Sequence, residues 1–149
     1  MLKFNSYSNV TDVVIPSKVK VIDRIEMCAE MVNLRNTTMD SIHVINMRNT
    51  YQSCSNLTTA VCGPRVTNMI NTYYYCRNLT TAVCGHNVIN MHQAYAHCDD
   101  LTTAVCGPNV TDMSVAYYYC YNLTTAVCGH NVTDMSSTYQ SCRNLTTAV

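Results

Sequence analysis

Tryptophan is absent from this sequence, phenylalanine occurs once, and charged side chains are scarce. Of the 149 residues, 12% are charged, with nine acidic and nine basic side chains, which is about half the share of an average globular protein. No basic stripe marks a nucleic-acid partner, and no apolar run reaches the roughly 18 residues of a membrane helix. Residues 1–7 also lack the apolar core of a secretory signal peptide. We therefore expect neither nucleic-acid binding nor membrane insertion.

Glycine is equally scarce, and its positions reveal a repeat. The four glycines stand 22 residues apart, each at the end of a segment that reads Leu-Thr-Thr-Ala-Val-Cys-Gly. Looser copies of the same unit precede residue 57, and a partial copy follows residue 144. We interpret the chain as a cap segment, 1–9, and a single solenoid of about six and a half repeats. The repeats are 10–33, 34–56, 57–78, 79–100, 101–122, 123–144 and the partial 145–149.

A unit of this length cannot bury its own apolar face, whereas stacked units form a continuous core. Leu-Thr-Thr-Ala-Val-Cys suits a short strand, and the glycine after it suits a turn. The stretch Met-x-x-x-Tyr-x-x-Cys then returns the chain to the next strand. Its apolar residues are spaced to share one face of a short helical turn, of the α or 3-10 type. The sequence thus predicts parallel strands stacked about 4.8 Å apart.

Two segments carry a family resemblance. Residues 15–22 have the form I-P-x-x-V-x-x-I, and residues 110–123 have the form V-T-D-M-x-x-x-Y-x-x-C-x-x-L. Both resemble the units of BspA-like bacterial surface leucine-rich repeats, with tyrosine in place of the usual phenylalanine, and the resemblance covers roughly residues 10–149. It implies a right-handed leucine-rich-repeat solenoid with a parallel β-sheet on one face. It also implies a non-enzymatic function in adhesion or protein interaction, on a cell surface or a virion.

In the fold that the resemblance implies, equivalent residues of successive repeats point inward and form columns. These core ladders are Leu57, Leu79, Leu101 and Leu123; Cys54, Cys76, Cys98 and Cys120; Cys62, Cys84, Cys106 and Cys128; Met69, Met91, Met113 and Met135; and Tyr73, Tyr95, Tyr117 and Tyr139.

The ten cysteines suggest a disulfide framework at first, but all except Cys28 fall into two series with the 22-residue spacing. We interpret them as columns of small buried thiols, although neighbours in a column come close enough for a disulfide zipper. Reduced thiols indicate synthesis in a reducing compartment. No C-x-x-C pair supports zinc, so we expect no metal and no cofactor.

The histidines and carboxylates offer little chemistry. His86 and His130 are two repeats apart, too far to share a metal ion. His97 beside Cys98 could form a catalytic pair, but we interpret it as an exposed turn histidine. The acidic residues of the repeats fall in predicted turns, so we expect no enzyme.

Eight N-x-[ST] sequons recur through the chain, but we attribute them to turn geometry before each strand rather than to glycosylation. They begin at Asn9, Asn36, Asn56, Asn78, Asn109, Asn122, Asn131 and Asn144.

Two surfaces are candidates for binding. One is the outer face of the predicted sheet, which is flat and uncharged. The other is a tyrosine-rich part of the return stretch, where rigid amphipathic rings suit contact with a protein or a surface glycan, although one repeat has Ala96 and His97 there. The candidate residues are Thr59, Thr81, Thr103 and Thr125 with Val61, Val83, Val105 and Val127 on the sheet, and Tyr74, Tyr75, Tyr118 and Tyr119 on the return.

The sequence stops at residues 145–149 with no polar terminal repeat of the kind that closes most solenoids. Three explanations are open: a longer natural chain, an end covered by a partner, or head-to-tail stacking of copies into a filament. The last is the alternative to an adhesion module, and its predicted end-to-end contacts are Leu145, Ala148 and Val149.

Overall fold

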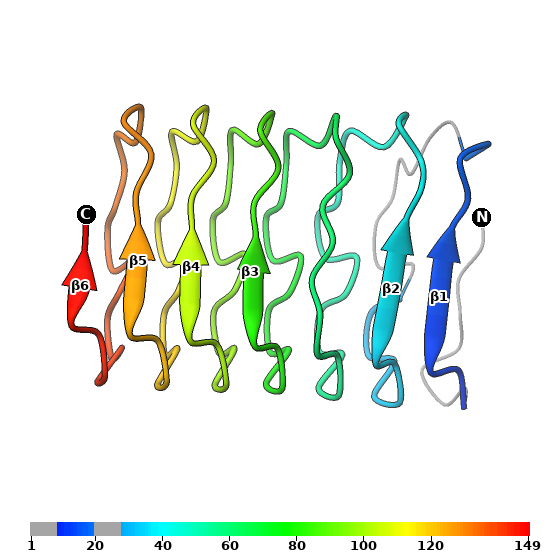
Figure 1. Ribbon diagram of the computed structural model, residues 1–149, viewed down its shortest axis with the longest axis horizontal. Coiled ribbons are helices and arrows are strands. Elements are labelled where there is room, and N and C mark those ends of the chain that lie inside the picture. The colour runs from blue at the N-terminus through cyan, green and yellow to red at the C-terminus, as the bar shows by residue number, and fades with distance from the viewer. Residues whose placement is uncertain (1–8, 20–27) are drawn as a thin grey trace.

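The computed structural model describes residues 9–19 and 28–149, and in these ranges the chain winds into a solenoid of stacked coils. The chain runs upward on the near side of each coil, as a short strand in most of them, and returns on the far side (Figure 1). The predicted solenoid is confirmed. The cap segment expected over 1–9 lies outside the described residues, apart from Asn9.

Six short parallel strands line one face in two sheets. The strands are β1 (Asp12–Ile15), β2 (Asn36–Met39), β3 (Thr81–Val83), β4 (Thr103–Val105), β5 (Thr125–Val127) and β6 (Thr147–Ala148). β1 pairs with β2, and β3 to β6 pair in chain order. The repeat length sets the register, so that Thr81, Thr103, Thr125 and Thr147 lie side by side. The coil between the two sheets contributes only a bridge, from Thr59 to Thr81.

A second ladder runs along the solenoid just before each return stretch. Single parallel bridges join Asn46, Asn68, Asn90, Asp112 and Asp134 in series. The side chains of these residues also hold the backbone, because each carbonyl or carboxylate oxygen accepts the amide hydrogen two residues on; for Asn68 and Ile70 the distance is 2.9 Å. This is the local hydrogen bond for which short polar side chains are favoured in turns.

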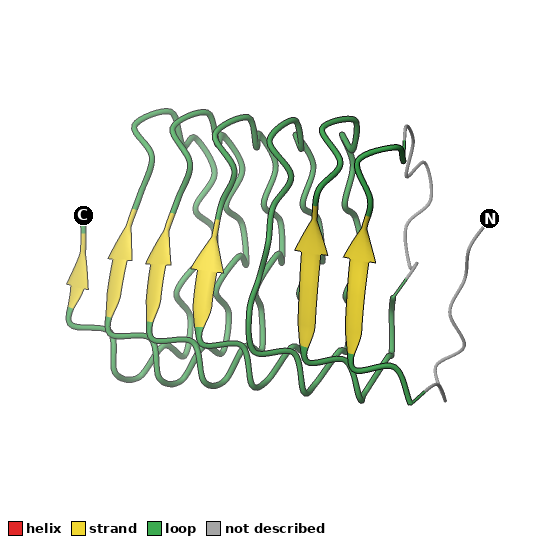
Figure 2. Cartoon of the chain, turned by 45° about the vertical axis from the view of Figure 1, so that its right-hand side comes forward, coloured by secondary structure: helices red, strands yellow, loops and turns green. Residues whose placement is uncertain are grey.

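The return stretch forms a chain of tight turns, where the sequence predicted short helical turns. No helix occurs in the described ranges (Figure 2). In the coil 57–78, alternate amides of 69–75 donate to carbonyls of the next coil at 2.8 to 3.0 Å. The amides of Thr72 and Cys76 instead donate to the carbonyls of Met69 and Tyr73, three residues back, both at 3.0 Å. A helix would use all these amides in hydrogen bonds within the return stretch, and the ladder of hydrogen bonds between coils would be lost.

Left-handed residues produce this alternation. Two residues of each complete return have positive φ, as for Asn71 at 54° and Tyr75 at 61°. None of these positions holds a glycine. Asparagine tolerates this conformation comparatively well, whereas a β-branched residue such as Val115, at 59°, is strained in it. The hydrogen bonds between coils therefore outweigh the φ preference of individual residues.

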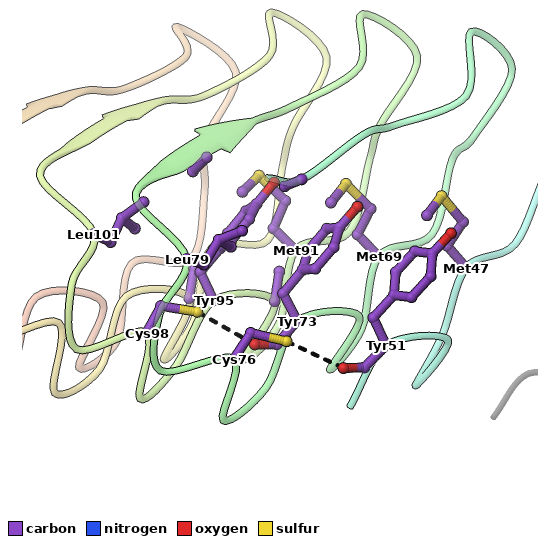
Figure 3. Close-up of a cluster of buried hydrophobic side chains, with 14 of the residues drawn as sticks. Met47, Tyr51, Met69, Tyr73, Cys76, Leu79, Met91, Tyr95, Cys98 and Leu101 are labelled. Atoms are coloured by element: carbon purple, nitrogen blue, oxygen red, sulfur yellow. Dashed lines mark hydrogen bonds between the residues drawn. The ribbon is translucent and has the colours of Figure 1, made fainter. Parts of the chain in front are cut away.

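The core is a stack of similar layers. In Figure 3, Tyr51, Tyr73 and Tyr95 lie one behind the next, with a methionine beside each ring. The Tyr73 and Tyr95 rings are stacked, with centroids 5.3 Å apart and planes 11° from parallel. The buried Tyr73 hydroxyl donates to the carbonyl of Val61 at 2.7 Å. This bond meets the requirement for a partner that tyrosine, unlike phenylalanine, brings into a core.

The predicted core ladders are buried along most of their length. Exceptions occur in the coil 123–144, where Met135 is 43% exposed and Tyr139 is half-buried. Ala148 and Val149 are exposed in the same region, and Leu145 is half-buried. Cys62, Cys84 and Cys128 are also half-buried, because they lie at the corner where the strand ends.

At two of the four glycines of this corner, the backbones of neighbouring coils approach too closely for a side chain. A Cβ on Gly107 would lie 2.7 Å from the carbonyl oxygen of Gly85, and one on Gly129 would lie 2.6 Å from that of Gly107. None of the four has a positive φ. The close approach, rather than the turn that we expected, therefore requires glycine.

We predict that Gly107→Ala lowers the free energy of unfolding by about 2 to 3 kcal/mol, because backbone must move to admit the methyl group. Gly63→Ala is the matched control. Its added Cβ would meet the Met39 side chain at 3.1 Å and no backbone oxygen closer than 3.5 Å. Urea unfolding followed by circular dichroism measures both, and equal losses would contradict the explanation.

We also predict that Val115→Asn raises the free energy of unfolding by about 1 kcal/mol, since asparagine relieves left-handed strain. Asparagine already occupies this register at Asn49 and Asn71. Val105→Asn, in strand β4, serves as the control and is expected to lower stability through lost strand propensity. Thermal melting of the two variants should therefore shift in opposite directions.

Candidate functional site: an exposed aromatic cluster

Six aromatic side chains from three successive coils meet on the return side of the solenoid. We call them the aromatic cluster: Tyr74, Tyr75, His97, Tyr118, Tyr119 and Tyr121. All six are half-buried, largely against one another. Because each coil sits directly behind the last, residues separated by 22 positions face each other across one coil step.

His97 joins the two tyrosine groups into one surface. Its ring stacks on Tyr75 with centroids 4.2 Å apart and planes 3° from parallel. On its other face it stacks on Tyr119, at 5.0 Å and 8°. We had interpreted His97 as an exposed turn histidine that interrupts the tyrosines, so this role was not predicted. The signal was its register, since His97 stands 22 residues from both tyrosines.

The other tyrosines pack edge-on against this stack. Tyr74 meets Tyr75 at 4.5 Å and 80°, and Tyr118 meets Tyr119 at 4.3 Å and 75°. Tyr121 packs against Tyr119 in the same manner, at 5.5 Å. Such edge-to-face and offset arrangements are the favoured geometries of aromatic pairs. The cluster is thus held together by its own ring contacts.

The backbone under the cluster is fixed as well. Tyr75, His97 and Tyr119 all have left-handed φ angles, between 59° and 61°. The Tyr75 amide donates to the carbonyl of Ala96 at 3.0 Å, and the His97 amide donates to that of Tyr118 at 2.8 Å. These bonds set the spacing of the coils and hence of the rings. A rigid surface loses little conformational entropy when a partner binds.

Charged groups flank the rings at both ends. The Arg77 guanidinium lies 5.6 Å from the centre of the Tyr75 ring, and that of Arg143 lies 5.4 Å from the centre of the Tyr121 ring. Arg77 also approaches Asp99 at 4.0 Å. Partial burial lowers the pKa of His97, with Arg77 acting in the same direction and Asp99 against it. The histidine is therefore neutral over most of the physiological range.

The Thr/Val surface on the strands has a different character. Val83, Val105 and Val127 are 50%, 51% and 42% exposed, and Thr81 and Thr103 are exposed beside them. Val61 and Thr125 are half-buried. The surface is regular and lacks charge along its length. It repeats the same two side chains from coil to coil, so it contains no feature that marks one coil.

The cysteine columns are built for packing. All ten cysteines are free. The thiols of the column from Cys54 to Cys142 donate to carbonyls of the preceding coil, as Cys76 does to Tyr51 at 3.1 Å and Cys98 to Tyr73 at 3.2 Å (Figure 3). Burial raises the pKa of Cys54 from 9.0 to about 12 and that of Cys62 to about 11. Such thiols are poor nucleophiles at neutral pH.

Within the described ranges, no group of three or more histidine, cysteine, aspartate or glutamate side chains is placed to hold a metal ion. His97, the candidate partner of Cys98, stacks in the aromatic cluster. The Cys98 thiol points into the core toward the Tyr73 carbonyl. The structure therefore does not bring these two residues together as a catalytic pair.

Several sequon asparagines lie in polar ladders between coils. The Asn56 amide nitrogen donates to the carbonyl of Val32 at 2.7 Å, and that of Asn78 donates to the Asn56 side chain at 3.2 Å. Asn36 likewise donates to Asp12 at 2.8 Å. Their function is to link one coil to the next, which extends the turn role expected from the sequence.

The fold and these surfaces define a class: a leucine-rich-repeat scaffold with side-chain ladders on its outer faces. A family model described as the BspA type leucine rich repeat region matches residues 2–58 and 28–146, in six copies. The matches span nearly the whole chain, so the chain belongs to the BspA-type leucine-rich repeat family, and the resemblance seen in the sequence is confirmed. No curated protein and no solved structure matches the chain.

Repeats of this family are generally non-enzymatic scaffolds that mediate protein interaction or adhesion. In the described part of the chain, no helix is both long and apolar enough to cross a membrane.

The buried thiols predict a loss of stability at alkaline pH. A thiol whose pKa is raised in the folded chain, as in Cys54 from 9.0 to about 12, stays protonated while the unfolded chain ionises. The contribution of such a thiol to the free energy of unfolding is complete below its pKa in the unfolded chain. Above that pKa, the free energy of unfolding falls by about 1.4 kcal/mol per pH unit for each such group. We expect the free energy of unfolding to be constant up to about pH 8.5 and to fall by pH 10.

Urea unfolding in the presence of a phosphine reductant, at several pH values from 7 to 10, measures this loss. The Cys76→Ala, Cys98→Ala double variant is the control. It should be less stable at pH 7 but should lose less with rising pH. A stability that is the same at pH 7 and pH 10 would contradict the prediction.

Proposed function

We propose that this chain is a non-enzymatic module for protein interaction or adhesion, associated with a cell surface or a virion, and that it binds its protein partner through the aromatic cluster. The observation that carries the proposal is the continuity of the cluster. His97 bridges Tyr75 and Tyr119, so that six rings from three coils form a single patch. Tyrosine and arginine are enriched among the residues that dominate protein interfaces.

Ring orientation favours a protein over a sugar as the ligand of this patch. The faces of Tyr75, His97 and Tyr119 cover one another along the solenoid axis, and Arg77 lies over the ring of Tyr75. A sugar that stacks on an aromatic ring needs an open face. Tyrosine rings whose faces are covered in this way suit hydrogen bonds and edge contacts with a protein surface.

The family resemblance supports the same function, since repeats of this kind are generally protein-interaction scaffolds. The Thr/Val surface on the strands is the competing site. Both surfaces can be tested in the same chain, because other coils show which residues the fold accepts at the positions of the aromatic cluster. Ser53 and Ser141 occupy the register of Tyr75, His97 and Tyr119, with the same left-handed backbone.

The test is a selection of random peptides, displayed on phage, against the whole purified chain. We expect selected peptides to bind the triple variant Tyr75→Ser, His97→Ser, Tyr119→Ser roughly tenfold or more weakly than the native chain, as for loss of interface anchors. Biolayer interferometry measures the affinity, and circular dichroism checks that the variant folds.

A second variant, Val83→Lys with Val105→Lys, alters the Thr/Val surface and should bind the same peptides as the native chain does. If the lysine variant loses binding while the serine variant keeps it, the sheet is the binding surface and the aromatic cluster is not. If neither variant changes the affinity, both surfaces are excluded.

A further inference from the structure

A groove of about 720 Å³ lies on the side of the solenoid between the end of each strand and the return stretch. Its lining residues come from five coils, and it lies apart from the aromatic cluster. Two rows of side chains line it, and we call it the asparagine groove: Arg65, Asn87, Asn109 and Asn131 on one side, and Ile45, Thr67, Ile89 and Thr111 on the other.

Each asparagine of the groove is fixed by one hydrogen bond from its side-chain amide to the preceding coil. The amide nitrogen of Asn87 donates to the Pro64 carbonyl at 2.6 Å, and that of Asn109 donates to the His86 carbonyl at 2.8 Å. Asn131 makes the same bond to Pro108, at 2.8 Å. Their side-chain oxygens accept no hydrogen bond from the described residues, and each amide keeps a second hydrogen, so the row presents an acceptor and a donor from each asparagine.

The threonines behave in the same way. The Thr67 hydroxyl donates to the Ile45 carbonyl and the Thr111 hydroxyl donates to that of Ile89, both at 3.4 Å. The lone pairs of these hydroxyls are left as acceptors. Ile45 and Ile89 alternate with these threonines along the row, and their side chains are 50% and 47% exposed. The groove therefore offers acceptors at intervals of about 4.8 Å, one coil step, interrupted by aliphatic surface.

This pattern selects among classes of ligand. An extended peptide repeats the groups on one edge every two residues, about 6.8 Å, which is out of step with the coil spacing of about 4.8 Å. A nucleic acid needs a row of basic side chains for its phosphates, and Arg65 alone in the lining is basic. A polyamine carries donors, but no acidic residue lines the groove, and Arg65 would repel it. A neutral glycan fits, because each hydroxyl can donate while the C–H faces of the sugar contact isoleucine.

We propose that the asparagine groove binds a neutral, linear oligosaccharide that lies along the solenoid axis. The site is separate from the aromatic cluster, so the chain would carry one surface for protein and another for glycan. The proposal does not depend on the peptide-binding function. Either surface can fail its test without affecting the other.

The experiment measures binding of linear hexasaccharides of glucose, mannose, xylose and N-acetylglucosamine to the whole chain by isothermal titration calorimetry. A sulfated heparin hexasaccharide and spermidine are the comparison ligands. We expect at least one neutral hexasaccharide to bind and neither charged ligand to compete with it. No binding of any neutral hexasaccharide at millimolar concentration would overturn the proposal, as would displacement by spermidine or the heparin hexasaccharide.

Two variants of the asparagine groove test whether the glycan binds there. Asn87→Arg with Asn109→Arg reproduces Arg65 in the same register and replaces two acceptors by donors. We expect it to weaken glycan binding roughly tenfold or more, by loss of hydrogen bonds to sugar hydroxyls. Ile89→Lys, which fills the groove, should have the same effect without altering the asparagines.

Tyr119→Ser, in the aromatic cluster, and Val83→Lys, on the strand β3, are the controls and should bind the glycan as the native chain does. Thermal melting confirms that each variant folds. Unchanged binding in both groove variants, or loss of binding in the Tyr119→Ser variant alone, would place the glycan elsewhere and overturn the proposal.

Discussion

The fixed spacing between coils is the constraint on which the rest of the structure depends. Backbone amides on both sides of each coil bond to the next coil, and each residue is thereby placed beside the residue one repeat away. Every other regularity follows. Tyrosines stack because the coil step is close to the separation of stacked rings. The thiol of Cys76 meets the carbonyl of Tyr51 for the same reason. Gly107 must lack a side chain because the step brings Gly85 too close.

Those features that depend only on the repeat could be predicted from the sequence. The parallel register of Thr81 and Thr103, the buried leucine column and the alignment of the cysteines in columns all follow from the 22-residue period. The path of the return stretch could not be predicted in this way. Residues three and four apart share a face in a helix, but they also do so in a string of tight turns. Val115 in a left-handed conformation goes against its own preference, and only the coil-to-coil hydrogen bonds account for it.

The outer surfaces were predictable only where one residue type recurs. The tyrosines of the aromatic cluster were identified by their type, but His97 was set aside because it differs from them. Its position in the stack depends on register rather than on chemistry. The asparagine groove was missed because its rows mix arginine with asparagine and isoleucine with threonine. Its chemical character comes from the direction of hydrogen bonds such as that of Asn109, and no sequence pattern specifies that direction.

A ladder that is identical in every coil has a functional weakness. A ligand bound to it could move along by one coil and make the same contacts again, so the ladder cannot fix where the ligand sits. The Thr/Val surface has this property, since Thr81 and Val83 recur unchanged in β4 and β5. A ligand on the aromatic cluster could not shift by one coil in this way, because Ser53 and Ser141 end the stack on either side of Tyr75, His97 and Tyr119. Specific recognition requires a single preferred register, and only a surface that varies along the solenoid can supply one. The uniform ladders thus maintain the fold, and a binding surface with a single preferred register requires the variation that is built on them.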